Sequence, residues 1–539
     1  MRRDDVLPHA AVRSAWLARE RSIAGSDYNR WLAIACALAI HLCIGTAYGF
    51  SVFLQPLSRA VGISAPITCP LGGSIWQALI RTSCDWQISQ IGWVFSLFFL
   101  VLGGSAALLG GWVERVGPRK AGIVAALCWS GGHVLAALGI WRHELWVVLL
   151  GYGGVGGVGL GLGYVLPIST LMRWFPDRRG LAGGLAVMGF GGGAMVGAPL
   201  AALLMDHFRG PNSVGAWQTM LVLAVLNLAA MSAGALAYRQ PPPGWQASMK
   251  VQPTAPQPRG SIDQTSALRM RQFWLLWLVL GLNTSVGMGV LGWAALMLQD
   301  LFGGRLLGLG STTMDALNPV QRLQLGTIAA SFTGLLSVFN VAGRLWWPWL
   351  SDRWGRQPVF SLVLALGIVL YAVAPAVARS GNVTLFVALV CVAITLFGGG
   401  FALVPGYIAD LFGPGYVSAI QGRVLTAWSV AAVAGPVLVG ALRDADRHQA
   451  AYGSALHGLA ALLAVALAAN LSIRAIPASR FGLDLWPAPP SPAQRHLPPR
   501  RALDAGLVVA WVSVGLPMAW GLWMTLGRLL PLLAAGRSQ

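Results

Sequence analysis

Apolar runs of about 20 residues recur along the whole chain, and no other feature constrains its fold as much. A run of this length crosses the hydrocarbon core of a bilayer as a single helix. A water-exposed fold could not bury so many of them, and the chain of 539 residues is 56% hydrophobic and only 10% charged. The predicted fold class is therefore an all-α polytopic membrane protein.

Twelve of these runs fall into two sets of six. The first set is predicted to span the membrane at 31–54, 87–112, 121–141, 145–171, 181–204 and 217–238. The second set is predicted at 273–298, 325–350, 359–378, 384–408, 424–442 and 452–473. A thirteenth run, 506–527, follows, and the sequence leaves open whether it spans.

The runs divide the chain into six segments. We predict an N-terminal tail (1–29), a six-helix half (30–238), a proline-rich linker expected to be extended or disordered (239–272), a second half (273–474), a proline-rich segment (475–503), and a further helix with its tail (504–539). With the N-terminus inside, cytoplasmic segments hold 25 of the 37 lysines and arginines, and external loops hold nine. This bias predicts a cytoplasmic N-terminus and explains the +19 charge without nucleic-acid binding.

The two halves repeat at one constant offset in the sequence. The separation of Pro167 from Pro405 equals that of Gly184 from Gly422, and we call this separation the repeat offset. Six helices per half place both halves in the same orientation, so the repeat is parallel. That arrangement is typical of a rocking transporter with its substrate site at the midplane between the halves.

The repeat offset also relates two charged turns that follow the second and eighth runs. They contain Glu114, Arg115 and Gly117, and Asp352, Arg353 and Gly355. A carboxylate at a helix end can meet the N-terminus of a neighbouring helix and nearby arginines. We interpret the turns as latches that must break before the protein opens inward. The alternative is a pair of basic loops that only set topology.

Arg344 lies within the eighth apolar run, with Asn340 one helical turn before it. A charge inside the hydrocarbon costs roughly 2.5–3.5 kcal/mol on insertion scales, so such a residue is a functional candidate. We predict that Arg344 faces a central cavity and binds an anion. The alternative is that its long side chain extends to the interface or forms a structural ion pair.

Other motifs have simpler interpretations. The glycines of 151–163 match a dinucleotide-binding pattern, but that motif needs a preceding strand, and close helix packing explains them better. His41, His133 and His457 could titrate with a transported proton, although neutral, hydrogen-bonded histidines are the simpler account. Cys69 and Cys84 alone lie outside the apolar runs, on the external side, and are predicted to form a disulfide rather than two free thiols.

The chain resembles the major facilitator superfamily and, within it, the oxalate/formate antiporter family, which is related to the monocarboxylate transporters. The resemblance covers roughly residues 30–474 and the C-terminal run. It is carried by the two charged turns and by 29–32, 45–48, 51–53, 173–180, 398–401, 409–413 and 516–523.

The resemblance implies that Arg344 pairs with a substrate carboxylate and that Asn340 hydrogen-bonds the same anion. Monocarboxylate transporters often carry an aspartate at the latter position, linked to proton coupling; the neutral residue here puts that route of proton symport in doubt. The resemblance also implies that Tyr48, Tyr164 and Phe397 line the cavity, with ordinary helix packing as the alternative.

Trp428 stands where oxalate carriers of this family have a lysine, which supplies a second cation. A dianion beside Arg344 alone would leave one buried charge unpaired, at a cost of several kcal/mol. Charge counting therefore favours a monocarboxylate over oxalate. With no HExxH, GxSxG or paired CxxC motif, the sequence gives no support for an enzyme.

We therefore predict a secondary active transporter that moves a small organic monocarboxylate, such as lactate, pyruvate or formate, across the bacterial inner membrane by alternating access. The alternatives are an oxalate/dicarboxylate:formate antiporter, a multidrug efflux transporter and a transport-inactive sensor. The expected partners are the lipid bilayer, the anionic substrate and a co-transported proton or counter-anion. We expect a monomer with no cofactor, no metal and no bound nucleic acid.

Overall fold

The computed structural model describes residues 17, 19–25, 28–63, 67, 79–80, 82–242, 260–310, 312, 316–445, 452–482 and 505–535. Every named element within these ranges is a helix. Thirteen stretches of helix in the described part of the chain are long and apolar enough to cross a membrane. The predicted class is confirmed, and the chain is a multi-pass membrane protein.

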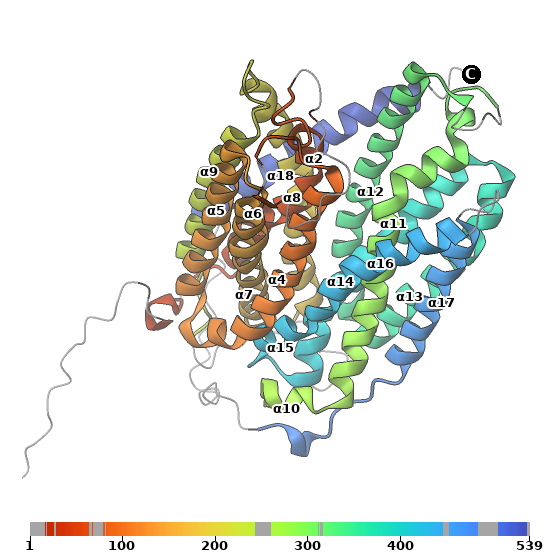
Figure 1. Ribbon diagram of the computed structural model, residues 1–539. Coiled ribbons are helices and arrows are strands. Elements are labelled where there is room, and N and C mark those ends of the chain that lie inside the picture. Colours follow the sequence, from red (N-terminus) through yellow and green to blue (C-terminus); the bar gives the residue numbers. More distant parts are fainter. Residues whose placement is uncertain are drawn as a thin grey trace, which may run out of the picture.

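The helices form two bundles that lie side by side, the N-terminal one in warm colours and the C-terminal one in green to blue (Figure 1). The first bundle contains α1 (Trp31–Gly45), η2 (Thr46–Phe50), α2 (Ser51–Leu57), α4 (Ile88–Val116), α5 (Pro118–Arg142), α6 (Leu145–Val148), the π-helical η3 (Leu149–Gly156), α7 (Gly157–Trp174), α8 (Arg179–His207) and α9 (Ala216–Ala237). The second contains α11 (Arg271–Leu306), α12 (Pro319–Trp354), α13 (Arg356–Ser380), α14 (Val383–Phe412), α15 (Val417–Val424), α16 (Thr426–Ala445) and α17 (Gly453–Leu471).

The internal repeat is visible in the helix boundaries. Shifting α5 by the repeat offset reproduces both ends of α13. The glycines that separate these helices from the preceding ones, Gly117 and Gly355, have φ angles of 81° and 90°, a region that favours glycine. The two charged turns therefore share one backbone conformation as well as one sequence pattern.

Two contacts related by the same repeat join the halves. In one, α8 packs on α12, where Gly184 lies against the carbonyl oxygen of Arg344. In the other, α15 packs on α4, where Gly422 lies against the carbonyl oxygen of Ala106. A side chain at either glycine would collide with backbone, so these positions set how closely the halves approach.

The segments outside the twelve-helix core are more structured than expected. The end of the linker, predicted to be extended, instead forms helix α10 (Gln264–Leu268), which the carboxylate of Asp263 caps. The thirteenth run forms α18 (Ala505–Ala535), which extends beyond the predicted 506–527. It runs obliquely across the bundle and contacts α1 and α8 of one half and α12 of the other (Figure 1).

One predicted disulfide partner can be placed. Cys84 is disulfide-bonded, whereas Cys69, its predicted partner, lies outside the described residues. The adjacent Asp85 accepts hydrogen bonds from the backbone amides of Val61, Gly62 and Ile67 at 2.8–3.2 Å and so fixes part of the loop after α2. The pairing of Cys69 with Cys84 stays a prediction.

Candidate functional site

Arg344 of α12 is almost completely buried and bridges the two halves. Its side chain is 1% exposed. Its Nε donates to Oδ1 of Asn340 at 3.1 Å, and its Nη1 donates to the carbonyl oxygen of Val187, in α8 of the other half, at 3.0 Å. The guanidinium therefore lies at the interface between the halves.

Aromatic rings surround the guanidinium. Its Cζ lies 5.8 Å from the ring centre of Phe190 in α8 and 5.5 Å from that of Phe401 in α14. Tyr48 of η2 packs against Phe190, with 5.1 Å between the ring centres. A cation over an aromatic face gains about 0.5–2 kcal/mol, which partly offsets the cost of taking the charge out of water.

Trp428 and Tyr164 complete the group. Trp428 of α16 is buried against Phe190 and Phe401, at ring-centre distances of 5.4 and 4.9 Å. Tyr164 of α7 lies 5.8 Å from Trp428. Within the described part of the chain, neither the Tyr164 hydroxyl nor Nε1 of Trp428 has a hydrogen-bond partner. Buried hydrogen-bond donors without partners are costly. An acceptor such as a carboxylate could bind to these two donors and remove that cost.

The site carries an unbalanced positive charge. Among the described residues, no carboxylate forms an ion pair with Arg344; those ion pairs that form lie elsewhere. In the repeat, Ala106 holds the position that corresponds to Arg344, so the other half supplies no second arginine there. The arrangement suits a single negative charge.

The structure brings together five of the six residues predicted for the site, and Phe397 is the exception. Within the described part of the chain, it is buried and packs against Gly287 of α11. Phe401, one helical turn later, lies beside Arg344 instead. Sequence reasoning also missed Phe190, although the repeat could have indicated it: it precedes Trp428 by the repeat offset, and the two rings meet edge to face.

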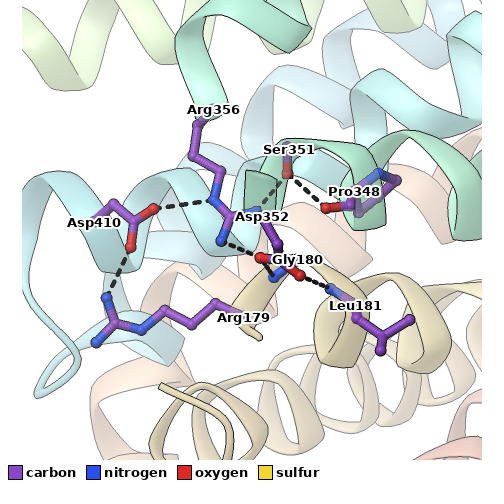
Figure 2. Close-up of polar contacts among 8 residues, drawn as sticks. All are labelled: Arg179, Gly180, Leu181, Pro348, Ser351, Asp352, Arg356 and Asp410. Atoms are coloured by element: carbon purple, nitrogen blue, oxygen red, sulfur yellow. Dashed lines mark hydrogen bonds and ion pairs between the residues drawn. The ribbon is translucent and has the colours of Figure 1, made fainter. Parts of the chain in front are cut away.

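Asp352, near the end of α12, lies in a charged cluster with residues of α8, α13 and α14 (Figure 2). Its two carboxylate oxygens accept hydrogen bonds from the amides of Gly180 and Leu181, at the start of α8, at 2.7 and 2.8 Å. We call the group in Figure 2 the Asp352 cluster; its members are Arg179, Gly180, Leu181, Pro348, Ser351, Asp352, Arg356 and Asp410.

Ion pairs reinforce the Asp352 cluster. Arg356 pairs with Asp352 at 2.6 Å and with Asp410 at 3.0 Å. Arg179, from the first half, pairs with Asp410, from the second, at 2.7 Å. Carboxylates at a helix N-terminus interact favourably with its exposed amides and its dipole. The cluster therefore ties α8 of one half to α12 and α14 of the other.

Glu114 makes the corresponding contact in the repeat. It accepts a hydrogen bond from the amide of Ser418, near the start of α15, at 2.9 Å. Ser418 follows Gly180 by the repeat offset, so both turns use one kind of contact. Glu114 also pairs with Arg173 of its own half, which donates in turn to the carbonyl oxygen of Gly415 at 3.1 Å.

The arginines of these clusters are not the predicted ones. Arg115 is exposed, and Arg353 is exposed and lies over the ring of Trp349 at 3.9 Å. Neither forms an ion pair with another described residue. The arginines that form ion pairs in the two clusters are Arg173, Arg179 and Arg356.

Comparisons with known proteins agree with this architecture. The oxalate:formate antiporter of Oxalobacter formigenes is 27% identical over 414 residues, which cover 76% of this chain and 83% of that one. Human monocarboxylate transporter 11 is 27% identical over 424 residues, 77% of each chain. The crystal structure of the human organic anion transporter MFSD10 has the same fold, with a TM-score of 0.57 at 14% identity, covering 83% of this chain and all of that one.

The resemblance seen in the sequence is thus confirmed at the level of the superfamily. The family model for the Major Facilitator Superfamily matches residues 36–436, which include most of both halves. This chain belongs to the major facilitator superfamily.

Proposed function

We propose that the protein is a secondary active transporter that moves a small organic monocarboxylate across the membrane by alternating access. The observation that carries the proposal is Arg344, a buried cation at the interface of the halves with no carboxylate paired to it among the described residues. One negative charge on the substrate would neutralise it. Asn340, Tyr48, Tyr164 and Trp428 would shape the rest of the site.

The comparisons support a carboxylate as substrate class. One relative is named for oxalate and formate, and another for monocarboxylates. The Asp352 cluster and the Glu114 contacts would form a cytoplasmic gate, because they join the halves at the ends of α12 and α4. Rocking of the halves would break them and open the site inward.

Uptake into proteoliposomes tests the substrate class directly. The purified protein should take up radiolabelled pyruvate, lactate or formate faster than oxalate or malonate at equal concentration. Empty liposomes supply the baseline. Faster uptake of the dicarboxylates would overturn the monocarboxylate assignment, and uptake of none of the acids would overturn the proposed function.

The unpartnered hydroxyl of Tyr164 gives a specific prediction. Tyr164→Phe should weaken monocarboxylate affinity about tenfold, because a hydrogen bond to a charged group contributes about 1.5–3 kcal/mol. Tyr371→Phe is the matched control, since it removes another buried hydroxyl, on α13, that has no hydrogen-bond partner among the described residues. Equal Km values for Tyr164→Phe and the wild type would exclude a contact between this hydroxyl and the substrate.

The similarity to an oxalate:formate antiporter keeps a dicarboxylate exchanger as the second candidate. Trp428→Lys should move the preference toward oxalate, because a second cation near Arg344 balances the second carboxylate. Trp428→Phe is the control that removes the indole without adding charge. Competition by oxalate against labelled pyruvate measures the change; equal competition in both variants would show that charge at this position does not select the substrate.

A further inference from the structure

His41 of α1 is a fully buried histidine whose two ring nitrogens both face backbone carbonyl oxygens. Nδ1 lies 2.8 Å from the oxygen of Ala186 in α8, and Nε2 lies 3.1 Å from that of Tyr164 in α7. A neutral imidazole has one N–H donor and one lone pair, whereas the imidazolium has two donors. Only the protonated ring can donate a hydrogen bond to both carbonyl oxygens.

Two effects oppose that protonation. Taking a charged ring out of water is unfavourable, and the charge of Arg344 is held on the same stretch of α8: Nδ1 of His41 faces the carbonyl oxygen of Ala186, and Nη1 of Arg344 donates to that of the next residue, Val187. Of the elements packed on α1, α7 faces His41 with Tyr164, whose ring centre is 5.3 Å away. The sequence of α9 and the described side chains of α18 contain no titratable group. The titratable residues of α8 lie only near its ends, and Tyr48 is the one titratable residue of η2. Arg344, attached to α8 through Val187, is therefore the charge beside His41 that a bound anion would cancel.

We propose that His41 is the binding site for a proton that travels with the carboxylate. An anion bound to Arg344 cancels the charge that opposes protonation, so it favours the imidazolium. Linkage is reciprocal, and a protonated His41 therefore favours anion binding. One proton and one monoanion would enter and leave together, on whichever side the site is open. This inference rests on the proposed carboxylate transport.

The geometry also connects the proton to helix packing. The imidazolium holds α1 to both α7 and α8 through its two donors. Loss of the proton leaves one carbonyl facing a ring lone pair, which weakens one of the two attachments. Tyr164 lies at this junction, since its carbonyl oxygen faces His41 while its ring packs beside Phe190 and Trp428 of the candidate site.

His133 of α5 shows what a structural histidine looks like in the same bundle. It is also buried, but among the described residues only its Nδ1 has a carbonyl contact, to Trp129 of the same helix at 2.8 Å. A neutral ring satisfies that contact fully. His133→Gln is therefore the matched control for His41→Gln.

The test uses proteoliposomes and whichever of pyruvate, lactate and formate the wild-type protein takes up fastest. An imposed gradient of one pH unit, alkaline inside, should concentrate it about tenfold, because one proton accompanies each anion. His41→Gln should still exchange internal for external substrate, yet show no accumulation above the external concentration. His133→Gln should accumulate as the wild type does.

A second measurement does not depend on a variant. Calorimetry of the wild-type protein in two buffers with different ionisation enthalpies should show net proton uptake when the monocarboxylate binds. Undiminished pH-driven accumulation by His41→Gln would overturn the inference, as would carboxylate exchange by the wild type with no response to the gradient. The failure of every carboxylate to enter would instead overturn the proposed function.

Discussion

Replacing Arg344 with glutamine should reduce monocarboxylate uptake by about 30-fold or more. Removing one partner of a buried, hydrogen-bonded charge pair costs about 2–5 kcal/mol, and each 1.4 kcal/mol is a factor of ten. The guanidinium is held on Asn340 and Val187 and lies between two aromatic rings, so no other described cation replaces it there. The measurement is the initial uptake rate in proteoliposomes at matched protein content.

Arg443→Gln is the control for that experiment. Arg443 also lies over aromatic rings, of Trp293 and Tyr452, but it pairs with Asp300 at 2.9 Å, away from the site. The Arg443→Gln variant should keep nearly the wild-type uptake rate, because an ion pair as exposed as this one contributes only about 0–1 kcal/mol to stability. Uptake by Arg344→Gln at the wild-type rate would show that the substrate does not depend on the buried cation.

Replacing Asp352 with asparagine should lower the maximal transport rate about tenfold and leave the Kd of the substrate close to that of the wild type. The carboxylate accepts two amides of the other half and pairs with Arg356. Losing a charge-assisted contact of this kind costs about 1.5–3 kcal/mol. The variant would then rest in an inward-open state and return slowly to the outward-open one.

Arg353→Gln controls for a change of charge in the same turn, because Arg353 is exposed and stacks on Trp349. It should transport at nearly the wild-type rate. Uptake measures the maximal transport rate and equilibrium binding measures the Kd, so a change in one can be told from a change in the other. A weaker affinity with an unchanged rate in Asp352→Asn would assign this carboxylate to the substrate and not to the gate.

The fold could be predicted from sequence because membrane spans depend mainly on local composition. The length of an apolar run sets a span, and the repeat offset related helices that the structure places in equivalent positions, such as α5 and α13. Helix α10 escaped prediction because its short segment has no apolar run of its own. Its formation depends on the Asp263 cap, and Ile262 beside it is buried.

The family resemblance and the charge pattern pointed to six site residues, of which the structure brings five together. Phe397 and Phe401 lie on one face of α14, four residues or about 6 Å apart along the axis. The sequence does not show which of the two rings lies level with Arg344, because the packing of α14 against α12 sets their positions along the helix axis. Phe401 lies beside the guanidinium, and Phe397 packs on Gly287.

The partners of the two latch carboxylates were missed for a geometric reason. Neighbouring residues on a helix do not face each other, so Arg115 cannot pair readily with Glu114, nor Arg353 with Asp352. A residue four positions away can, and Arg356 stands four after Asp352. Arg173 and Arg179 come from a distant stretch of sequence, where only the folded chain brings them to these carboxylates.

The most direct measurement is binding of radiolabelled pyruvate to the purified protein in competition with lactate, oxalate and the uncharged ester methyl pyruvate. The ester keeps the shape of pyruvate and lacks its charge. If Arg344 neutralises a single carboxylate, lactate should displace the label, oxalate should do so weakly and methyl pyruvate should not. Displacement by methyl pyruvate as strong as that by lactate would contradict a site built around one buried positive charge.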